Sequence, residues 1–224
     1  SHQQQFFLSI KAIIQQKLCI LLLKAYLCAP KIIPPLIVTM IAINDTFELV
    51  ALRWKDRATL VKYLNDPEYH RTTGGIPYPY TLDSATWFYN YVHEFELEHG
   101  FVREFSICHR PTDEIIGGIG LVNNAILTPQ DSQVEIGYWL ARPYWGQGIM
   151  TTILRFFVQY VFQKWQIPRL YAYTMVWNHR SQQVLLRCGF VYDPQLRKTV
   201  IRNNESQDLI GFYITPTTPT PDHS

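Results

Sequence analysis

Two glycines at the start of a predicted helix are the residues whose types and spacing most directly suggest chemistry. Gly146 and Gly148 stand in the stretch EIGYWLARPYWGQGIMTT, which runs from Glu135 to Thr152 and reads as a strand, a short loop and a helix. A Gly-x-Gly turn lets the backbone approach a ligand closely, and the free amides at a helix N-terminus attract anions. The pattern therefore suggests a phosphate site, although the same two glycines also suit a plain turn.

The neighbouring elements must position this turn. Val134–Ala141 has few charges and is expected to form a central strand. The helix expected over Gln147–Lys164 has a continuous apolar stripe, and Pro168 separates it from a strand over Arg169–Met175. Because one helix connects these two strands, they are expected to run parallel and to be neighbours in the sheet.

The rest of the chain after Met40 alternates between strands and helices. Expected strands are Phe47–Arg53, Phe101–His109, Glu114–Val122, Phe190–Arg202 with an interruption, and Leu209–Thr215; expected helices are Asp56–Asn65, one from Thr81 to Gly100, and Arg180–Cys188, which Asn178 caps. This order predicts an α+β fold with a mixed, mostly antiparallel sheet. It argues against a doubly wound dinucleotide fold, because no acidic residue ends a second strand in a repeated βαβ unit.

A long loop is expected from Tyr69 to Tyr80, which contains TTGGIPYPY. Loops of this length that are rich in aromatic residues usually cover or bind something. Tyr78 and Tyr80 are therefore candidates for a substrate-binding wall, with a packed connector as the alternative.

Composition limits the classes of function. The 224 residues are 47% hydrophobic and 17% charged, with a net charge of +2, so no general nucleic-acid-binding footprint is present. Four cysteines match no zinc spacing, and no metal constellation is expected. They are interpreted as isolated thiols in a reducing compartment, which favours a cytoplasmic location; these residues are Cys19, Cys28, Cys108 and Cys188.

Residues 1–42 differ in pattern from the rest of the chain and are treated as an N-terminal extension or leader. A helix is expected from about Phe7 to Cys28, packed on the domain or on a second subunit, so a homodimer is possible. The apolar run Leu18–Cys28 contains Lys24 and is too short for a membrane span, whereas a targeting peptide or an interfacial helix stays open. A single domain is expected over residues 43–215, followed by a flexible tail over 216–224.

Two blocks resemble a known family. EIGYWLARPYWGQGIMT, followed by WNHRSQQVLLRCGF, is similar to the GNAT superfamily of acetyl-CoA-dependent N-acetyltransferases. Within it, these blocks and GGIPYPYTLDSATWF most resemble the RimJ/RimL type, which acetylates protein N-terminal amines, notably of ribosomal proteins. The likeness runs from about Ile43 to Ile214. Pro143 stands where the superfamily usually has Gln or Arg, and proline is common at that position in this branch.

The resemblance implies a fold in which the two central parallel strands splay apart and helices flank the sheet. Acetyl-CoA would enter that gap as co-substrate. Its pantetheine would pair with the backbone of Trp139 and Leu140, and Asn178 would hydrogen-bond the same arm from the other wall. Ser181 would lie near the thioester sulfur. Backbone amides would hold the pyrophosphate along the loop and first helical turn, which comprise Gly146, Gln147, Gly148, Ile149, Met150 and Thr151.

Acetyl transfer requires a base for the amine. Glu135 is the first candidate, because acids on this strand often act as base in the superfamily and burial would raise the pKa of its carboxyl. A shift of one residue in strand phase would instead turn Glu135 to the outer face. Glu104, His109 and His179 are alternatives, as is a chain of water molecules without a single base.

The departing thiolate requires a proton or a hydrogen bond. Many superfamily members carry a tyrosine seven residues after the capping asparagine, but here that residue is Leu185. The hydroxyl of Ser181 is the remaining candidate, although a serine in the first turn of a helix also satisfies backbone groups. The sequence argues against a serine hydrolase, because the chain lacks a G-x-S-x-G elbow.

The sequence therefore predicts an acyltransferase that moves an acetyl group from acetyl-CoA to a primary amine, a protein or peptide N-terminal α-amine being the first candidate. Two alternatives stay open. One is the same chemistry on a small amine, such as an antibiotic, a polyamine or an amino sugar. The other is a member without catalytic activity that binds acyl-CoA as a sensor.

Overall fold

A computed structural model describes residues 39–73, 75–122, 134–202 and 205–216. The chain divides into two units, Ser1–Leu36 and Ile37–Ser224, and all described residues belong to the second. The helix expected at Phe7–Cys28, the polar loop expected at 123–133 and residues 217–224 of the expected tail lie outside the described residues.

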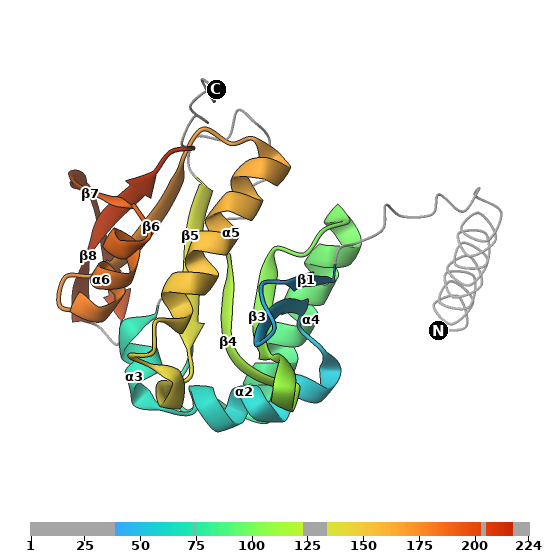
Figure 1. Ribbon diagram of the computed structural model, residues 1–224. Helices are drawn as coiled ribbons and strands as arrows, with labels where there is room; N and C mark the ends of the chain where they lie inside the picture. The colour runs from blue at the N-terminus through green and yellow to red at the C-terminus, as the bar shows by residue number, and fades with distance from the viewer. Residues whose placement is uncertain (1–38, 74, 123–133, 203–204, 217–224) are drawn as a thin grey trace, which may run out of the picture. The chain divides into compact units, whose positions relative to one another are not determined.

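The second unit is built on one eight-stranded sheet in the order β1-β2-β3-β4-β5-β6-β8-β7 (Figure 1). All neighbours pair antiparallel except β5 and β6, which are parallel. This confirms the predicted mixed, mostly antiparallel sheet. The strands are β1 (Met40–Ala42), β2 (Phe47–Ala51), β3 (Glu104–His109), β4 (Glu114–Leu121), β5 (Val134–Leu140), β6 (Leu170–Met175), β7 (Val191–Arg202) and β8 (Glu205–Ile214).

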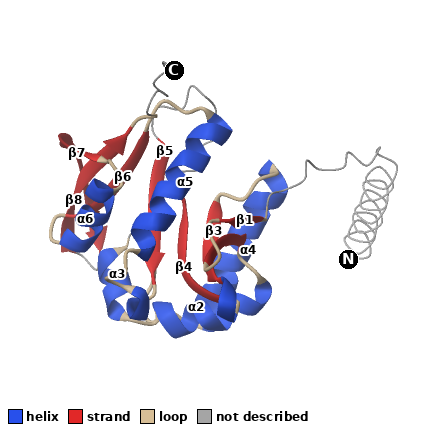
Figure 2. Cartoon of the chain, viewed as in Figure 1, coloured by secondary structure: helices blue, strands red, loops and turns tan. Residues whose placement is uncertain are grey.

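Helices cover both faces of the sheet (Figure 2). They are α2 (Arg57–Leu64), α3 (Pro67–Thr72), α4 (Leu82–His99), α5 (Ile149–Trp165) and α6 (His179–Arg187), with single turns η1 (Trp54–Asp56), η2 (Arg110–Thr112) and η3 (Arg142–Tyr144). The buried stripe of α5 packs on one face in a cluster that includes Ile136 and Leu170. The opposite face packs on α2, α3 and α4 in a second cluster that includes Leu60, Tyr69 and Val92.

The two strands and the helix around the Gly-x-Gly turn lie where the sequence predicts them. Alternation places Val134 and Ile136 of β5 in the α5 cluster, whereas Trp139 joins the opposite cluster. The odd-numbered and even-numbered residues of β5 therefore face opposite sides of the sheet. This division decides on which face each candidate side chain lies.

Two elements differ from the prediction. α3 occupies the start of the loop expected at Tyr69–Tyr80, because Asp66 accepts a hydrogen bond from the Glu68 amide (2.9 Å) and Pro67 is its first residue. β1 pairs with β2 and lies within the segment 1–42 that the sequence assigns to an extension. The interruption expected in the strand that begins near Phe190 is present as a register shift between Asp193 and Arg197.

Within the described ranges, no helix combines the length and the apolar character that crossing a membrane requires.

Candidate active site

The strands β5 and β6 separate shortly after they meet. Their parallel pairing in the described chain consists of Val134 with Leu170 and Glu135 with Tyr171. Beyond these pairs β5 continues to Leu140 and β6 to Met175, so a gap opens toward the carboxyl ends of both strands (Figure 1). Unpaired strand edges present free amides and carbonyls to a ligand.

Backbone parity along β5 determines which groups face this gap. Val122 donates its amide to the carbonyl of Glu135 (2.8 Å), and Ala141 donates to Ile116 in β4 (2.7 Å). Odd-numbered residues thus face β4, and even-numbered residues face the gap. Of the two residues expected to pair with pantetheine, Leu140 faces the gap, whereas Trp139 turns its backbone to β4. The expectation for the Trp139 backbone is corrected on this ground, and Tyr138 takes its place at the gap edge.

The Gly-x-Gly loop lies at the open end of the gap. Gly146 has φ 75° and Gly148 has φ 74°, a left-handed conformation that strains any residue with a Cβ atom. A Cβ atom built at either glycine meets no heavy atom within 4 Å, so the space in front of both is open. The first amide of α5 that donates to a backbone carbonyl, among the described residues, is that of Thr152, to Gly148 (3.1 Å).

The amides from Gly146 to Thr151 therefore precede the hydrogen-bonded part of the helix. This geometry, with a positive helix end and space for an anion, fits a phosphate group.

The other wall of the gap is the start of α6. Asn178 caps this helix by accepting a hydrogen bond at Oδ1 from the Ser181 amide (3.3 Å). The capping bond uses the oxygen of Asn178 and leaves its Nδ2 donors for a ligand. The Ser181 hydroxyl lies 2.9 Å from the hydroxyl of Tyr138, which reaches over from β5. The two walls are thus joined by a pair of hydroxyl groups.

Tyr138 is the functional candidate that sequence reasoning missed. Leu185, at the position where many relatives carry tyrosine, is 1% exposed and belongs to the α5 cluster. The phenol beside Ser181 comes from a different element, and burial raises the pKa of Tyr138 above its usual range. Tyr138 therefore stays protonated at neutral pH and acts as a hydrogen-bond partner. In the assembled sheet Tyr138 lies on the same face as Val134 and Ile136, and this face is the one that α5 and α6 cover.

Two aromatic residues fix the end of β5. Tyr69 of α3 donates its hydroxyl to the carbonyl of Leu140 (3.0 Å), and the indole Nε1 of Trp145 donates to the same oxygen (2.5 Å). Arg142 is held by Asp66, with its Nη2 2.7 Å from Oδ2. These contacts attach the Gly-x-Gly loop to α3 and to its capping residue Asp66.

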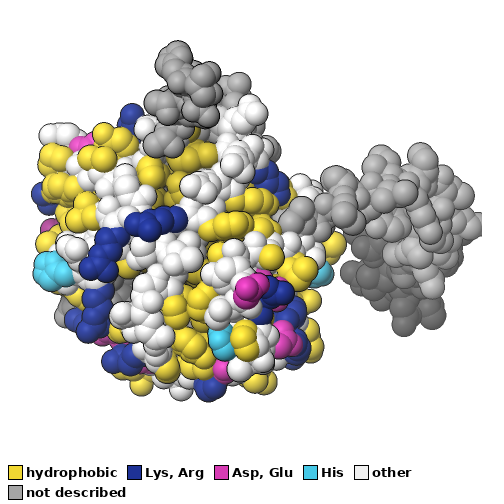
Figure 3. All heavy atoms as spheres, in the orientation of Figure 1, with side chains coloured by type: hydrophobic (Ala, Val, Ile, Leu, Met, Phe, Trp, Pro, Cys, Tyr) yellow, Lys and Arg dark blue, Asp and Glu magenta, His cyan; other side chains and the backbone are white. Residues whose placement is uncertain are grey.

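The helices on this side of the sheet are basic. α5 and α6 contain no Asp or Glu, and they carry Arg155, Lys164, Arg180 and Arg187. Figure 3 shows several Lys and Arg side chains over these helices. A cavity of about 500 Å³ lies between α5 and the start of β7, lined by residues that include Arg155 and Arg187, and none of the candidate cofactor-binding residues lines it.

The opposite face of the sheet holds two carboxylates near the gap. Glu104 of β3 lies against Gly120, and Gly120 pairs with Gly137 of β5. This pair is called the glycine floor, and the Val122 side chain leans over its Gly137 end. Burial raises the pKa of the Glu104 carboxyl to about 7, and the nearby guanidinium of Arg103 opposes this rise (Nε to Oε1, 3.8 Å). A carboxyl with such a pKa can exchange protons near neutral pH.

Glu135 also lies on this opposite face, because its residue number is odd. Its Oε2 is 2.5 Å from the ammonium Nζ of Lys198 in β7, and its side chain is 16% exposed. Glu135 thus stands at the closed end of the gap, on the side away from α5 and Ser181.

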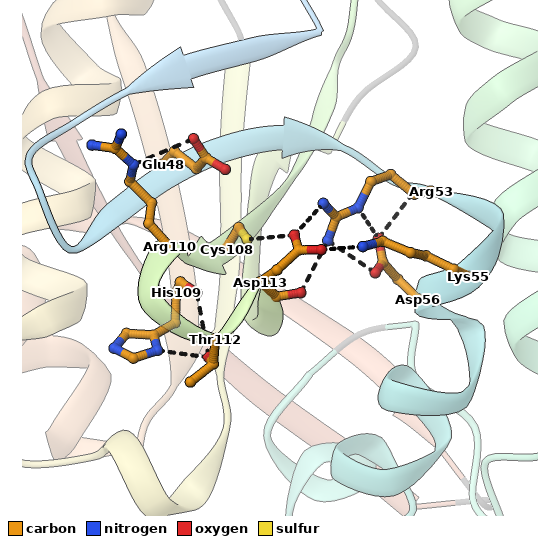
Figure 4. Close-up of polar contacts among 9 residues, drawn as sticks. All are labelled: Glu48, Arg53, Lys55, Asp56, Cys108, His109, Arg110, Thr112 and Asp113. Carbon is orange, nitrogen blue, oxygen red and sulfur yellow. Dashed lines mark hydrogen bonds and ion pairs between the residues drawn. The ribbon is translucent and has the colours of Figure 1, made fainter.

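The two histidine alternatives lie outside the gap. His109 ends β3, which β4 separates from β5, and its Nδ1 is 2.7 Å from the Thr112 hydroxyl in the hairpin turn (Figure 4). His179 is exposed in the first turn of α6, with Nδ1 3.4 Å from Oε1 of Gln182. Neither imidazole is brought to the glycine floor by these contacts.

The two tyrosines expected to bind substrate differ in exposure. Tyr78 is 50% exposed, whereas Tyr80 is 4% exposed and packs in the second cluster. Burial raises the pKa of Tyr80 to about 12. The expected substrate wall is thus corrected for Tyr80, whose side chain packs in the core.

The described cysteines are free thiols. Cys108 is buried, and burial raises its pKa to about 11, while Cys188 lies 3.4 Å from the carbonyl of Thr151. No group of three or more His, Cys, Asp or Glu side chains within the described ranges is arranged to hold a metal ion.

A protein-family model matches more than half of the chain. The family described as "Acetyltransferase (GNAT) domain" covers residues 46–191, which include both walls of the gap and the Gly-x-Gly loop.

Two individual relatives are similar to the chain at 27–30% identity. The ribosomal-protein-serine acetyltransferase of Escherichia coli (strain K12) is 30% identical over 112 residues, which are 50% of this chain and 60% of that protein. The uncharacterized N-acetyltransferase p20 of Bacillus licheniformis is 27% identical over 154 residues, 69% of this chain and 84% of that protein. The chain thus spans about 60% of the E. coli protein's length.

Solved structures share the fold. The microcin C7 self-immunity acetyltransferase MccE, in complex with acetyl-CoA and AMP, superposes with a TM-score of 0.68 at 20% identity, over 81% of this chain and 98% of that one. RimL, a ribosomal L7/L12 α-N-protein acetyltransferase in complex with coenzyme A, gives 0.66 at 19% identity, over 79% and 97%.

Proposed function

The chain belongs to the GNAT acetyltransferase family, and on this premise we propose that it transfers the acetyl group of acetyl-CoA to a primary amine. We propose a protein or peptide N-terminal α-amine as the acceptor, which attacks the thioester directly. The observation that carries the proposal is the gap between β5 and β6, with two left-handed glycines and a helix N-terminus at its open end.

The donor is held by backbone groups. The amides from Gly146 to Thr151 cradle the pyrophosphate, and the basic helices α5 and α6 attract its charge. Gap-facing amides of Tyr138 and Leu140 pair with the pantetheine arm, and Nδ2 of Asn178 binds it from the other wall. One of these amides also donates to the oxyanion that forms during attack.

The hydroxyl pair serves the leaving group. Ser181 donates a hydrogen bond to the departing thiolate, while Tyr138 holds the serine hydroxyl in place from β5. Because thiolates leave readily, this contact completes a reaction that depends chiefly on holding amine and thioester together. The absence of a tyrosine at Leu185 is offset by this arrangement.

The acceptor approaches from the opposite face. Glu135 receives the ammonium at the closed end of the gap, and Glu104 accepts its proton across the glycine floor, through water. An α-ammonium has a pKa of about 8, within roughly one unit of Glu104, whereas a lysine ammonium has a pKa of about 10.4. Proton transfer to Glu104 is therefore much less uphill from an α-amine, which supports this acceptor class.

The relatives support the same class at modest identity. The E. coli relative carries the name of a ribosomal-protein-serine acetyltransferase, and a structural neighbour is described as an α-N-protein acetyltransferase. Free thiols at Cys108 and Cys188 agree with the proposed cytoplasmic location.

A free-thiol release assay tests the proposal. Acetyl-CoA is incubated with the protein and one of four acceptors: peptides with a free α-amine, the same peptides with a blocked α-amine and a free lysine, polyamines, or amino sugars. Thiol release with the first group alone supports the proposal, and release with polyamines or amino sugars alone identifies a small-amine enzyme. A melting-temperature rise with acetyl-CoA but no release with any amine identifies a sensor.

A further inference from the structure

The ammonium group of Lys198 is held by a carboxylate and an aromatic ring. The Nζ of Lys198 is 2.5 Å from Oε2 of Glu135 and 3.7 Å from the centroid of the Tyr173 ring. A carboxylate and an aromatic face are the two groups that bind an alkylammonium ion best in proteins. The contacts come from three strands, β7, β5 and β6.

The strand order makes this a long reach. β8 lies between β7 and β6, and Lys198 pairs with Leu209 of β8. The lysine side chain therefore crosses β8 and β6 before it meets Glu135 on β5. Glu135 pairs with Tyr171 at the last point where β5 and β6 touch, so the ammonium ends beside the closed end of the gap.

The two partners differ in how firmly they are held. The Glu135 side chain is 16% exposed, whereas the Lys198 side chain is 44% exposed. A partly buried carboxylate is costly without a cation beside it, so this position requires some ammonium or guanidinium group. The Lys198 side chain is long, flexible and exposed. A second ammonium group can replace it with little loss of free energy, because exposed ion pairs contribute only about 0–1 kcal/mol.

From these contacts we propose that Lys198 occupies the subsite of the acceptor ammonium, and that an acceptor binds by displacing it from Glu135 and Tyr173. This inference rests on the proposed function, since it names how that site selects a primary ammonium. Lys198 pairs with Glu135 while the site has no acceptor, and it competes with every acceptor that enters. Uncharged nucleophiles do not displace it, which makes Lys198 a specificity-determining residue.

The kinetic test replaces the lysine by groups of similar length. Lys198→Met removes the competing ammonium, so the KM for a peptide acceptor is expected to fall by about two- to fivefold, the size of an exposed ion pair, with the KM for acetyl-CoA unchanged. Lys198→Arg is expected to raise the acceptor KM, because guanidinium pairs with carboxylate in a bidentate way.

A matched control is available in α2. Lys62 forms an ion pair of the same type with Glu114 (2.7 Å) and is 60% exposed, on an element outside the gap. Lys62→Met is expected to leave both KM values unchanged. An acceptor KM that stays constant or rises in Lys198→Met overturns the proposal, as does an equal change in Lys62→Met or a fall in kcat alone.

A binding test does not depend on turnover, so the failure of the proposed function and the failure of this inference are distinguishable. The probe is a peptide whose α-amine is dimethylated. This tertiary amine is positively charged when protonated, but it cannot be converted into an amide. Reaction of Lys198 with a succinimidyl ester, measured by mass spectrometry, is expected to increase when the probe displaces it, while reaction of Lys62 stays constant. Unchanged reactivity of Lys198 at saturating probe contradicts the displacement.

Discussion

The two faces of the sheet beside the gap differ in the kind of group they present. On the α5 side, the candidate groups are backbone amides and two hydroxyls, and the covering helices α5 and α6 contain Arg and Lys but no Asp or Glu. On the other side, they are the carboxylates of Glu104 and Glu135. Of the helices that cover this side, α4 contains Asp83, Glu94, Glu96 and Glu98 but no Lys or Arg, whereas α2 carries Arg57 and Lys62.

This difference matches two substrates of opposite charge. Coenzyme A carries phosphates, which suit the basic helices α5 and α6, and the acceptor arrives as an ammonium ion, which suits the carboxylates of the other side. The two meet through the gap, where neither strand pairs with the other. Catalysis here depends mainly on holding the amine and the thioester close together. Separate binding faces favour this, because neither substrate competes for the groups that bind the other.

The largest effect is expected from a change on the α5 side of the sheet, called the donor face below; the opposite side is called the acceptor face. Gly146→Val places a branched side chain at φ 75° in the space proposed for the pyrophosphate. The melting-temperature rise caused by acetyl-CoA is expected to vanish, corresponding to at least about a hundredfold loss of affinity. Gly75→Val is the control, since a Cβ there also meets nothing within 4 Å but the backbone is outside the left-handed region. An unchanged ligand shift in Gly146→Val would remove the phosphate assignment.

The hydroxyl pair is tested next. Ser181→Ala and Tyr138→Phe are each expected to lower kcat by about 10- to 100-fold with small changes in both KM values, because the contact acts on the leaving thiolate. The double variant is expected to lose little more than Ser181→Ala, since both hydroxyls act as a unit. Tyr160→Phe, which removes a hydroxyl that accepts a bond from Lys164 (2.9 Å), should leave kcat unchanged. Fully additive losses would show that Tyr138 does not act through Ser181.

The two carboxylates of the acceptor face, Glu104 and Glu135, are expected to differ in how their substitution changes the kinetics. Glu104→Gln should lower kcat by about tenfold and abolish the limb of the pH–rate profile near pH 7. Glu135→Gln should raise the acceptor KM and leave the affinity for acetyl-CoA unchanged, because Glu135 is proposed to bind the acceptor ammonium. If the Glu104→Gln profile keeps its limb near pH 7, the proton acceptor is another group.

The same substitution has a stability signature of defined sign. A carboxyl whose pKa rises from 4.5 to about 7 on folding binds more protons in the folded state, so its penalty is absent below pH 4.5 and complete above pH 7. Glu104→Gln is therefore expected to stabilise the protein at pH 8 by about 1–3 kcal/mol and to have little effect at pH 4. Urea unfolding at the two pH values measures the difference.

The donor face could be predicted from the sequence because its chemistry depends on backbone. Gly146, Gly148 and Asn178 act through the local geometry of a turn and a helix cap, and local sequence encodes both. The acceptor face depends on which way each strand residue points and on register across three strands. Sequence named Glu135 and Glu104 as candidates, but their common face and the contact with Lys198 require the assembled sheet.

Tyr138 and α3 show the same limit. A shift of one residue in β5 would turn Tyr138 away from Ser181, and nothing in the local pattern fixes that phase. The Asp66-Pro67 pair reads equally well as a turn and as a helix start, and burial of Tyr69 against Trp139 decides between them.

The smallest expected effect lies outside both faces, at the hairpin between β3 and β4. Asp113 pairs there with Lys55 and Arg53 (Figure 4), and these contacts lower the pKa of its carboxyl to about 2. Because the folded pKa lies below the usual 3.8, the stabilisation is complete above pH 3.8 and is lost as pH falls through 2. Asp113→Asn should lower the melting temperature slightly at pH 7, since the pair is exposed, and the gap to wild type should close toward pH 2. Neither kcat nor either KM should change; a change in the acceptor KM would mean that the acceptor face extends beyond Glu104 to this end of β3.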